Sequence, residues 1–383
     1  MPLDLPLQRR RYAVFSNQNQ DGGSGNKCRY SLQKAGTGMK KTVDNFQPAG
    51  GMHCITNAMK QIFNFYGHPL SEEMLFGLGE GLDFAYINMA HSPMVSGRSK
   101  IMEFEGILSK RLGVGMKFRK GRDNNKSFEA ARKMIDGNQP VLIYADMPYL
   151  PYMSLDPDSH FGGHAVVLFG YDDEQGCFYV SDRDNPDFPV RTPGGMIAEN
   201  YHMVSYEQME LARSSAFRPF PANNKYIMFD FSNFKNADNA GIRQAIMAVC
   251  DKMLNPQARL KGICGIEKFG KEIIKWGSFD AAKLRTAAIT NYFQISADGG
   301  TGGGIFRKMY GGFLLEAAEL LENSRIRTIG SRFFEIAEEW DIVANELWEV
   351  SEDGHSSLLL HISEEIRALH DAEYDLYSQL TKL

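Results

Sequence analysis

Hydrophobic residues recur every three or four positions from residue 54 to residue 66, the spacing of one buried face of an α-helix. That face is made by Ile55, Ala58, Met59, Ile62, Phe63 and Tyr66. Gly67 is expected to end the helix, and Pro69 prevents it from resuming. Shorter helical patterns follow at 71–79, 99–112 and 127–137.

Continuous apolar runs between turn residues replace this spacing after residue 139 and predict strands. The runs cover 140–146, 164–171 and 177–182. The polar turn 172–176 joins the last two, which predicts a β-hairpin. Helices followed by strands indicate an α+β domain with an antiparallel sheet.

Strand signals nearly stop after the Pro-rich segment at 217–221, and helical patterns take over. They cover 236–254, 267–276, 278–294, 304–323, 327–350 and 355–381. The polar, Gly-rich stretch 16–27 has no apolar periodicity and is typical of a linker. We therefore expect three parts: a flexible N-terminal segment at 1–43, a catalytic domain at 44–216 and a mostly helical domain at 217–383.

The composition argues against several classes of function. The formal net charge of −5 over 383 residues argues against a nucleic-acid-binding protein, which usually has a basic face. No apolar run is long enough to span a membrane, and the first residues lack the order of a signal peptide, so we expect a cytoplasmic protein. The five cysteines are widely and irregularly spaced, which suggests neither a disulfide framework nor a zinc site.

Cys54 stands where a Gly-Gly turn meets the start of the first predicted helix. Unpaired N–H groups and the positive end of the helix dipole favour a thiolate there and can receive an oxyanion. The competing interpretation is a buried structural cysteine, which is the common fate of this residue.

His164 and Asp182 favour a catalytic Cys54 over a structural one. His164 opens one arm of the predicted hairpin and Asp182 ends the other, so the topology makes them neighbours. A carboxylate beside an imidazole fixes its tautomer and supports the imidazolium form. We therefore predict a papain-like Cys54–His164–Asp182 triad.

Four motifs resemble the N-terminal domain of the butirosin biosynthesis protein H family, and the helical remainder is similar to the domain that accompanies it. The motifs are Gly51-Met52-His53-Cys54, Asp146-Met147-Pro148-Tyr149-Leu150-Pro151-Tyr152, Gly163-His164-Ala165-Val166-Val167 and Ser181-Asp182-Arg183. The resemblance covers about residues 44–383. It implies a papain-like fold and transfer of an aminoacyl group from the phosphopantetheine thioester of an acyl-carrier protein to a small-molecule amine, in natural-product or antibiotic biosynthesis.

One departure concerns the oxyanion donor. Papain-like peptidases usually carry a glutamine a few residues before the cysteine, whereas Gln47 is seven residues before Cys54 (54 − 47). Gln47 can fill that place, and His53 or Asn45 are the alternatives. The proposed chemistry needs no cofactor and no metal ion.

Several further residues are candidates for substrate binding, namely His53, Asp146, Tyr149, Thr301 and Arg307. Asp146 and Tyr149 belong to an aromatic, Pro-rich loop that suits a cationic amine, or they form a strand-end cap. Thr301 and Arg307 belong to a Gly-rich turn and the helix after it. This turn resembles an anion site for phosphopantetheine, or is a flexible interhelical loop. The many Glu of the later helices are expected to be solvated.

Three functions stay open: an acyltransferase, a peptidase or amidohydrolase using the same triad, and a non-catalytic binding protein on the same fold. The peptidase or amidohydrolase differs from the acyltransferase in using water as the acyl acceptor. The sequence names neither donor nor acceptor, and a homodimer through the helical domain is the working expectation for the oligomeric state.

Overall fold

The computed structural model describes residues 38–88 and 92–383, so the predicted linker at 16–27 lies outside the described residues. The chain forms two compact units. Unit 1 contains described residues 38–46 and 119–226, and unit 2 contains 47–118 and 227–383. This division differs from the linear one that we expected, because residues 47–118 group with the helical part of the chain.

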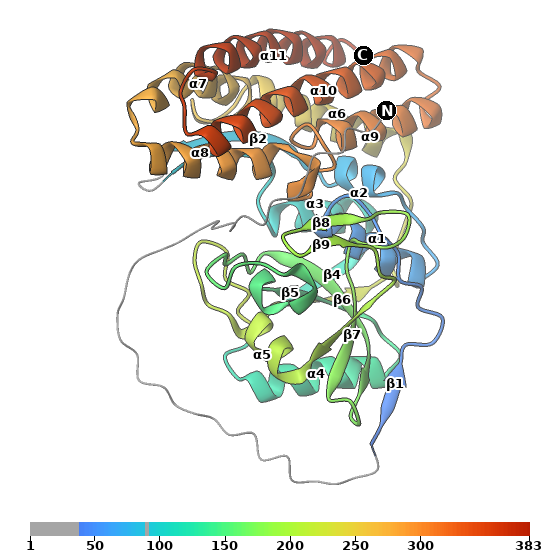
Figure 1. Cartoon of the computed structure of the whole chain (residues 1–383). Helices are drawn as coiled ribbons and strands as arrows, with labels where there is room; N and C mark the ends of the chain where they lie inside the picture. Colours follow the sequence, from blue (N-terminus) through green and yellow to red (C-terminus); the bar gives the residue numbers. More distant parts are fainter. Residues whose placement is uncertain (1–37, 89–91) are drawn as a thin grey trace. The chain divides into compact units, whose positions relative to one another are not determined.

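Unit 1 is built on an antiparallel sheet with the strand order β10-β7-β6-β5 and with β1 also paired to β6 (Figure 1). Its strands are β1 (Lys40–Thr42), β5 (Val141–Ala145), β6 (His164–Asp172), β7 (Cys177–Ser181) and β10 (His202–Ser205). The three predicted strands are thus confirmed. β1 shows that the segment expected to be flexible, 1–43, ends in a paired strand.

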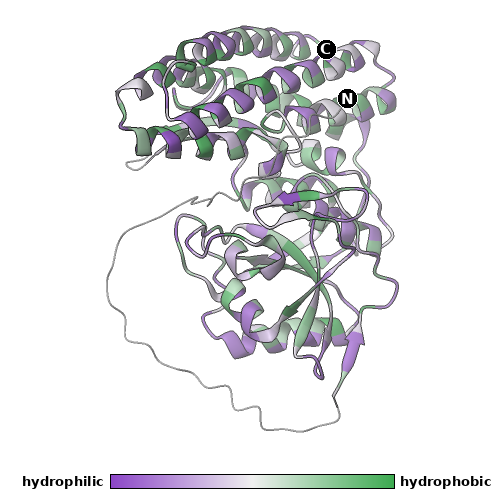
Figure 2. Cartoon of the chain, in the orientation of Figure 1, coloured by the Kyte–Doolittle hydropathy of each residue, from purple (hydrophilic) through white to green (hydrophobic). Residues whose placement is uncertain are grey.

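Two helices, two 3₁₀ turns and a small hairpin complete unit 1. They are α4 (Asn124–Asp136), η1 (Met147–Tyr149), η2 (Pro151–Met153), β8 (Val190–Thr192), β9 (Gly195–Ile197) and α5 (Tyr206–Ser214). β5, β6 and β7 are buried along their whole length, and Figure 2 shows hydrophobic colour along these strands. A strand buried on both faces has a continuous apolar run, which is why the sequence revealed these three strands.

Unit 2 is mostly helical. Its helices are α1 (Cys54–Phe65), α2 (Glu72–Leu78), α3 (Glu103–Leu112), α6 (Asn239–Leu254), α7 (Gly262–Ile273), η3 (Ile274–Ser278), α8 (Ala281–Ile295), η4 (Ala297–Gly299), α9 (Arg307–Leu320), α10 (Ser324–Asp353) and α11 (Leu359–Leu380). Its hairpin is β2 (Leu82–Asn88) with β3 (Pro93–Arg98). β4 (Gly115–Arg119) and β11 (Tyr226–Asp230) are neighbours in a sheet, and boundaries between the units fall inside both.

Side-chain packing explains why residues 47–118 belong to the helical unit. Gly77 of α2 leaves no room for a side chain, because a Cβ atom there would lie 1.9 Å from the ring of Phe313 on α9. The Asn291 amide of α8 bonds to the backbone of β3 at both Pro93 and Val95. Tyr86 of β2 stacks on Phe269 of α7 at a ring distance of 5.5 Å.

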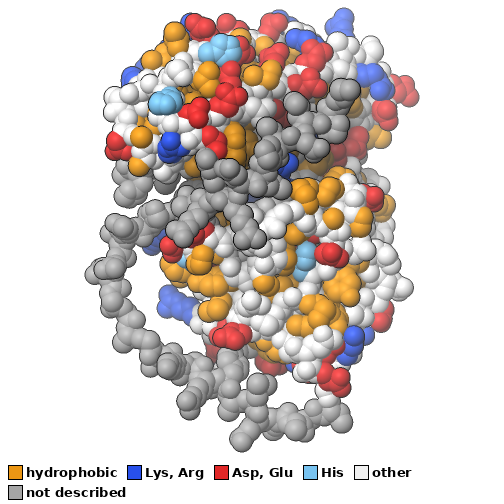
Figure 3. Space-filling model, viewed as in Figure 1, with side chains coloured by type: hydrophobic (Ala, Val, Ile, Leu, Met, Phe, Trp, Pro, Cys, Tyr) orange, Lys and Arg blue, Asp and Glu red, His pale blue; other side chains and the backbone are white. Residues whose placement is uncertain are grey.

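The described chain is an α+β protein with an antiparallel sheet in its N-terminal region and helices in its C-terminal region. In its described residues no helix is both long and apolar enough to cross a membrane. Figure 3 shows acidic side chains interspersed with basic ones on the visible face of the helices. Glu319, Glu335 and Glu338 are exposed, as expected of solvated faces, while Glu316 and Glu339 are half-buried.

Candidate active site

Cys54 is the first residue of α1, as predicted, and its side chain is half-buried. His53 precedes it in an extended conformation, so the chain turns into the helix at the cysteine itself. The first turn contains no acidic residue, which leaves the positive end of the helix dipole uncompensated by its own side chains. The thiol of Cys54 thus stands at the end of a helix where negative charge is favoured.

A buried carboxylate fixes the turn that leads into Cys54. Glu72 Oε1 accepts the backbone N–H of Met52 at 2.8 Å, and Oε2 accepts that of His53 at 3.1 Å. Thr56 Oγ1 donates to Oε2 at 2.8 Å, and Lys60 lies 3.7 Å from Oε1. Burial raises the pKa of Glu72, while Lys60 and these hydrogen bonds oppose the rise. The N–H groups of residues 52 and 53 are therefore already engaged.

His53 has a structural role that differs from the predicted substrate contact. Its ring is 7% exposed, Nδ1 donates to the Gly300 carbonyl oxygen at 2.8 Å, and Nε2 accepts from the Arg98 guanidinium at 2.6 Å. These partners select the neutral tautomer with the proton on Nδ1. Both ring nitrogens bond within the protein, which gives His53 a structural role, and its contact with substrate stays a prediction.

The Gly-rich turn at 298–304 packs against the residues before Cys54 rather than forming a flexible loop. A Cβ at Gly302 would lie 3.3 Å from the Met52 sulfur, which shows how closely the turn approaches. Thr301 is 2% exposed; its hydroxyl lies 2.9 Å from the carbonyl oxygens of Ile295 and Ser296 and accepts from the Gly303 N–H. Thr301 therefore stabilises the turn through its hydroxyl, and its contact with substrate stays a prediction.

Arg307 also differs from its prediction as a phosphate contact. Its side chain is fully buried, and it donates from Nε and from a terminal nitrogen to the two oxygens of Glu373 at 3.0 and 2.9 Å. Burial would lower the pKa of the guanidinium, but Glu373 outweighs this effect and raises it. No face of this group is presented to a ligand in solvent, so Arg307 is a core residue.

In unit 1, His164 and Asp182 form a buried pair. His164 Nε2 lies 2.7 Å from Asp182 Oδ2, and the residues are 4% and 2% exposed. The pair lies where β6 begins and β7 ends, as the hairpin predicted. Burial would raise the pKa of Asp182, but His164 and hydrogen bonds from the Arg183 N–H and the Tyr152 hydroxyl lower it overall. Asp182 is therefore a carboxylate that holds the proton of His164 on Nε2.

A third residue joins this pair. The Tyr152 hydroxyl donates to Asp182 Oδ2 at 2.9 Å, the oxygen that also receives His164. Burial, together with the nearby Asp182, raises the pKa of Tyr152 well above its usual range, so the phenol stays a donor. Its ring stacks on His202 at 3.7 Å, and His202 is bonded to Asp184 at 2.8 Å. Sequence reasoning missed this network because no spacing rule connects its members.

Asp146 is buried at the end of β5 and holds its own loop together. It accepts His160 Nδ1 at 2.8 Å, the Phe161 N–H at 2.7 Å and the Ser215 hydroxyl at 2.5 Å. These hydrogen bonds are those of the strand-end alternative, and binding of an amine by Asp146 stays a prediction. Tyr149 is half-buried beside it, and burial raises the pKa of its phenol.

The predicted catalytic residues are divided between the units. Gln47 and Cys54 lie in unit 2, whereas His164 and Asp182 lie in unit 1. The Gln47 side chain is exposed. Its role as an oxyanion donor stays a prediction. Within the described part of the chain, no group of His, Cys, Asp and Glu is arranged to hold a metal ion.

Comparison with known families adds an independent line of evidence. Residues 53–183 match the family model described as butirosin biosynthesis protein H, N-terminal, and residues 207–380 match a domain of unknown function, DUF4872. No curated protein matches the chain. The first model begins one residue before Cys54 and ends one residue after Asp182, so it spans the whole predicted triad.

Proposed function

Because the chain belongs to the butirosin biosynthesis protein H family, we propose that it is an enzyme of natural-product biosynthesis that transfers an acyl group through Cys54. The family description names the biosynthesis of an antibiotic, which supports a biosynthetic enzyme. Acyl transfer, the cysteine intermediate and a carrier-protein thioester as donor are our more specific inferences.

The buried His164–Asp182 pair is the observation that carries this proposal. A histidine whose Nε2 proton is held by a carboxylate has the tautomer of a general base, with its lone pair on Nδ1. The Tyr152 hydroxyl and the backbone N–H of Arg183 donate to that carboxylate and keep it ionised and oriented. Cys54 supplies the complementary half, a thiol at a helix N-terminus that is fixed by Glu72.

In the proposed reaction His164 Nδ1 takes the proton of the Cys54 thiol, and the resulting thiolate attacks the carbonyl carbon of the donor thioester. The S–C bond to the donor breaks, His164 protonates the departing phosphopantetheine thiolate, and an acyl-Cys54 thioester results. The acceptor amine then attacks this thioester, His164 accepts the amine proton, and Cys54 leaves as thiolate. N–H groups at the start of α1 stabilise the oxyanion in both halves. One thioester replaces another in the first half, so that step is close to thermoneutral.

Intact-mass spectrometry tests the intermediate directly. The full chain is incubated with an acyl thioester of a pantetheine analogue, without an amine. We expect one added acyl group on the wild type and none on Cys54→Ala. The matched control is Cys264→Ala, which removes an exposed thiol on α7. Cys264 should acylate no faster than an ordinary cysteine, so this variant should still gain the acyl group. An adduct that persists in Cys54→Ala would refute the nucleophile.

The coupling between Cys54 and His164 is tested by the rate of alkylation. The pH profile of iodoacetamide labelling at Cys54 is compared in wild type and His164→Ala. We expect labelling near neutral pH to slow by at least tenfold in the variant, because the base that promotes the thiolate is lost. Equal profiles would favour a binding protein that retained the fold.

Hydrolysis is the second candidate function, since water can replace the amine. Release of free acid is followed with and without a primary amine. An enzyme that transfers acyl groups gives amide at the expense of acid, whereas a hydrolase releases acid at the same rate in both conditions.

A further inference from the structure

Unit 1 contains a second buried histidine–aspartate pair besides His164 and Asp182, and the proposed chemistry does not use it. His202 Nε2 lies 2.8 and 3.0 Å from the two oxygens of Asp184. His202 is 8% exposed and Asp184 is 2% exposed. Asp184 Oδ2 also accepts the backbone N–H of Glu199 at 3.0 Å, which anchors the carboxylate. The orientation of the His202 ring is therefore fixed by the protein.

The sheet brings this histidine to the end at which Asp182 lies. His202 begins β10, and it is paired with Val180 in the antiparallel ladder between β10 and β7. Asp182 follows Val180 by two residues, directly after the end of β7. The two histidine–aspartate pairs are therefore neighbours at one end of the sheet because of strand register, although His202 is 38 residues after His164 (202 − 164).

Tyr152 connects the two pairs. Its hydroxyl donates to Asp182 Oδ2 at 2.9 Å, and its ring lies flat on that of His202, with 3.7 Å between the ring centres and 9° between the planes. Among the described residues, His202 is the only aromatic ring that contacts the Tyr152 ring. Tyr152 belongs to η2, a turn of three residues, so neither a strand nor a longer helix holds its backbone. The stack on His202 therefore directs the phenol hydroxyl towards Asp182.

The direction of this hydroxyl determines how the charge of Asp182 is shared. Oδ2 of Asp182 receives both Tyr152 and His164, at 2.9 and 2.7 Å. A donor from Tyr152 stabilises part of the negative charge, so less of it remains to stabilise the imidazolium form of His164. Loss of this donor would raise the pKa of His164 and leave less of the free base at neutral pH.

We propose that His202 and Asp184 are positioning residues for the proposed reaction: Asp184 holds the His202 ring, and this ring holds Tyr152 against Asp182. The two residues thereby set the basicity of His164 without contacting substrate. This role rests on the proposed function, in which His164 is the general base. Its test does not, because the pKa of His164 is measured without an acyl donor.

NMR titration of the full chain with isotope-labelled histidine tests the proposal, and the signal of His164 is the one missing in His164→Gln. His202→Gln can still donate to Asp184 but lacks the ring. We expect it to raise the pKa of His164 by about half a pH unit to one pH unit, as Tyr152→Phe should. The double variant should show no further rise, because both changes remove the same hydrogen bond.

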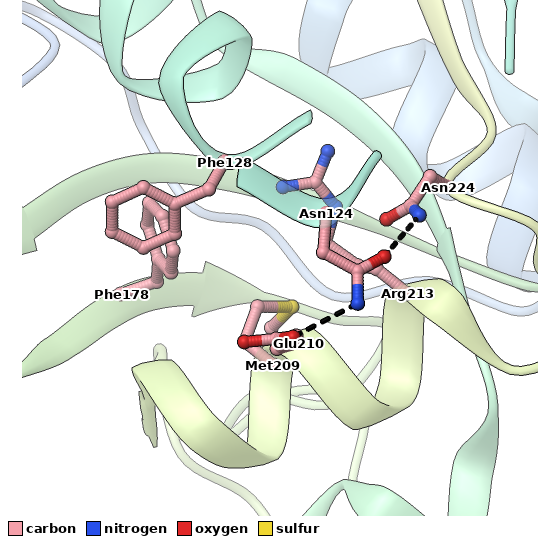
Figure 4. A pocket seen from close by; sticks show the side chains of 7 residues that line it. All are labelled: Asn124, Phe128, Phe178, Met209, Glu210, Arg213 and Asn224. Carbon is pink, nitrogen blue, oxygen red and sulfur yellow. Dashed lines mark hydrogen bonds between the residues drawn. The ribbon is translucent and has the colours of Figure 1, made fainter. Parts of the chain in front are cut away.

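A different polar network of unit 1 supplies the control for a loss of stability. At the pocket in Figure 4, Asn224 donates to Asn124 at 2.9 Å, and Asn124 donates to Glu210 at 2.8 Å. Asn124→Ala breaks this network, so we expect a lower Tm and an unchanged pKa of His164. A merely structural role for His202 predicts that same combination for His202→Gln, and observing it would overturn the proposal.

Two further variants at the same position make the test specific for the ring. His202→Phe restores a ring on which Tyr152 can stack, so the pKa of His164 should return towards the wild-type value. His202→Leu has similar bulk and no ring, and it repeats the test if His202→Gln does not fold. A rise in His202→Phe as large as that in the variant without a ring, or a rise that adds to that of Tyr152→Phe, would also overturn the proposal. Failure of Cys54 to take up an acyl group would instead refute the proposed function and leave these pKa values as they are.

Discussion

The ion pair between Arg307 and Glu373 gives the sharpest test of a core role against a ligand-binding role. Both side chains are fully buried, and Glu373 also accepts the Trp340 indole N–H at 2.7 Å and the Tyr377 hydroxyl at 3.1 Å. Removing one partner of a buried pair leaves an uncompensated charge and costs about 3–5 kcal/mol. We therefore expect Arg307→Met to lower the free energy of unfolding by about 4 kcal/mol.

A double-mutant cycle separates the pair from its surroundings. Glu373→Gln keeps an oxygen that can accept from Trp340 but removes the negative charge, so alone it should be nearly as damaging as Arg307→Met. The double variant has no unpaired charge, and we expect it to lose about 2 kcal/mol less than the sum of the two single variants. Urea unfolding followed by tryptophan fluorescence measures all three, since every tryptophan of the chain lies in unit 2.

Arg327 on α10 provides the control. It forms an exposed pair with Glu319 at 3.5 Å, and such surface pairs contribute at most about 1 kcal/mol. Arg327→Met should therefore be close to wild type in stability. A phosphate-binding role for Arg307 makes the opposite prediction for its variant: an unchanged free energy of unfolding and a raised KM for the phosphopantetheine donor. That combination would refute the core role.

Three further predictions concern the candidate site. Glu72→Gln leaves a single acceptor oxygen for the turn before Cys54, so we expect a loss of about 1–3 kcal/mol in the free energy of unfolding, measured by urea unfolding. Tyr152→Phe removes a donor that competes with His164 for one Asp182 oxygen, so NMR titration should show a raised pKa for His164, and a fall would contradict this. The folded-state pKa of Asp182 is lowered, so the ionised group stabilises the folded protein fully above its unfolded pKa and loses this effect as pH falls through the folded pKa. The stability of Asp182→Asn should therefore fall less than that of wild type as the pH drops below about 4.

The elements that sequence analysis predicted well are those whose signal is local. Helix α1 follows from apolar residues three and four apart, and the hairpin of β6 and β7 follows from two buried runs around a polar turn. The pairing of His164 with Asp182 followed from that hairpin because topology brings its two ends together. Each of these inferences needed only neighbouring residues and the geometry of one element.

The features that the sequence did not reveal depend on partners far along the chain. The Gly-rich turn before Arg307 predicts an anion contact, but the charge of Arg307 is paired with Glu373, 66 residues later. The hairpin of β2 and β3 was missed because its strands are stabilised by helices of the C-terminal region, through Asn291 for example. Glu72 lies in the first turn of α2, and no sequence pattern indicates its hydrogen bonds to the turn before Cys54.

The alternation of the chain between the two units has a practical consequence for anyone who divides this protein. Three crossings, after residues 46, 118 and 226, separate the segments of each unit. A fragment ending at residue 216 would contain α2 and the β2–β3 hairpin but lack α7, α8 and α9, against which they pack. Chimeras between family members should therefore exchange 47–118 together with 227–383, so that the two halves of one core are inherited from the same parent.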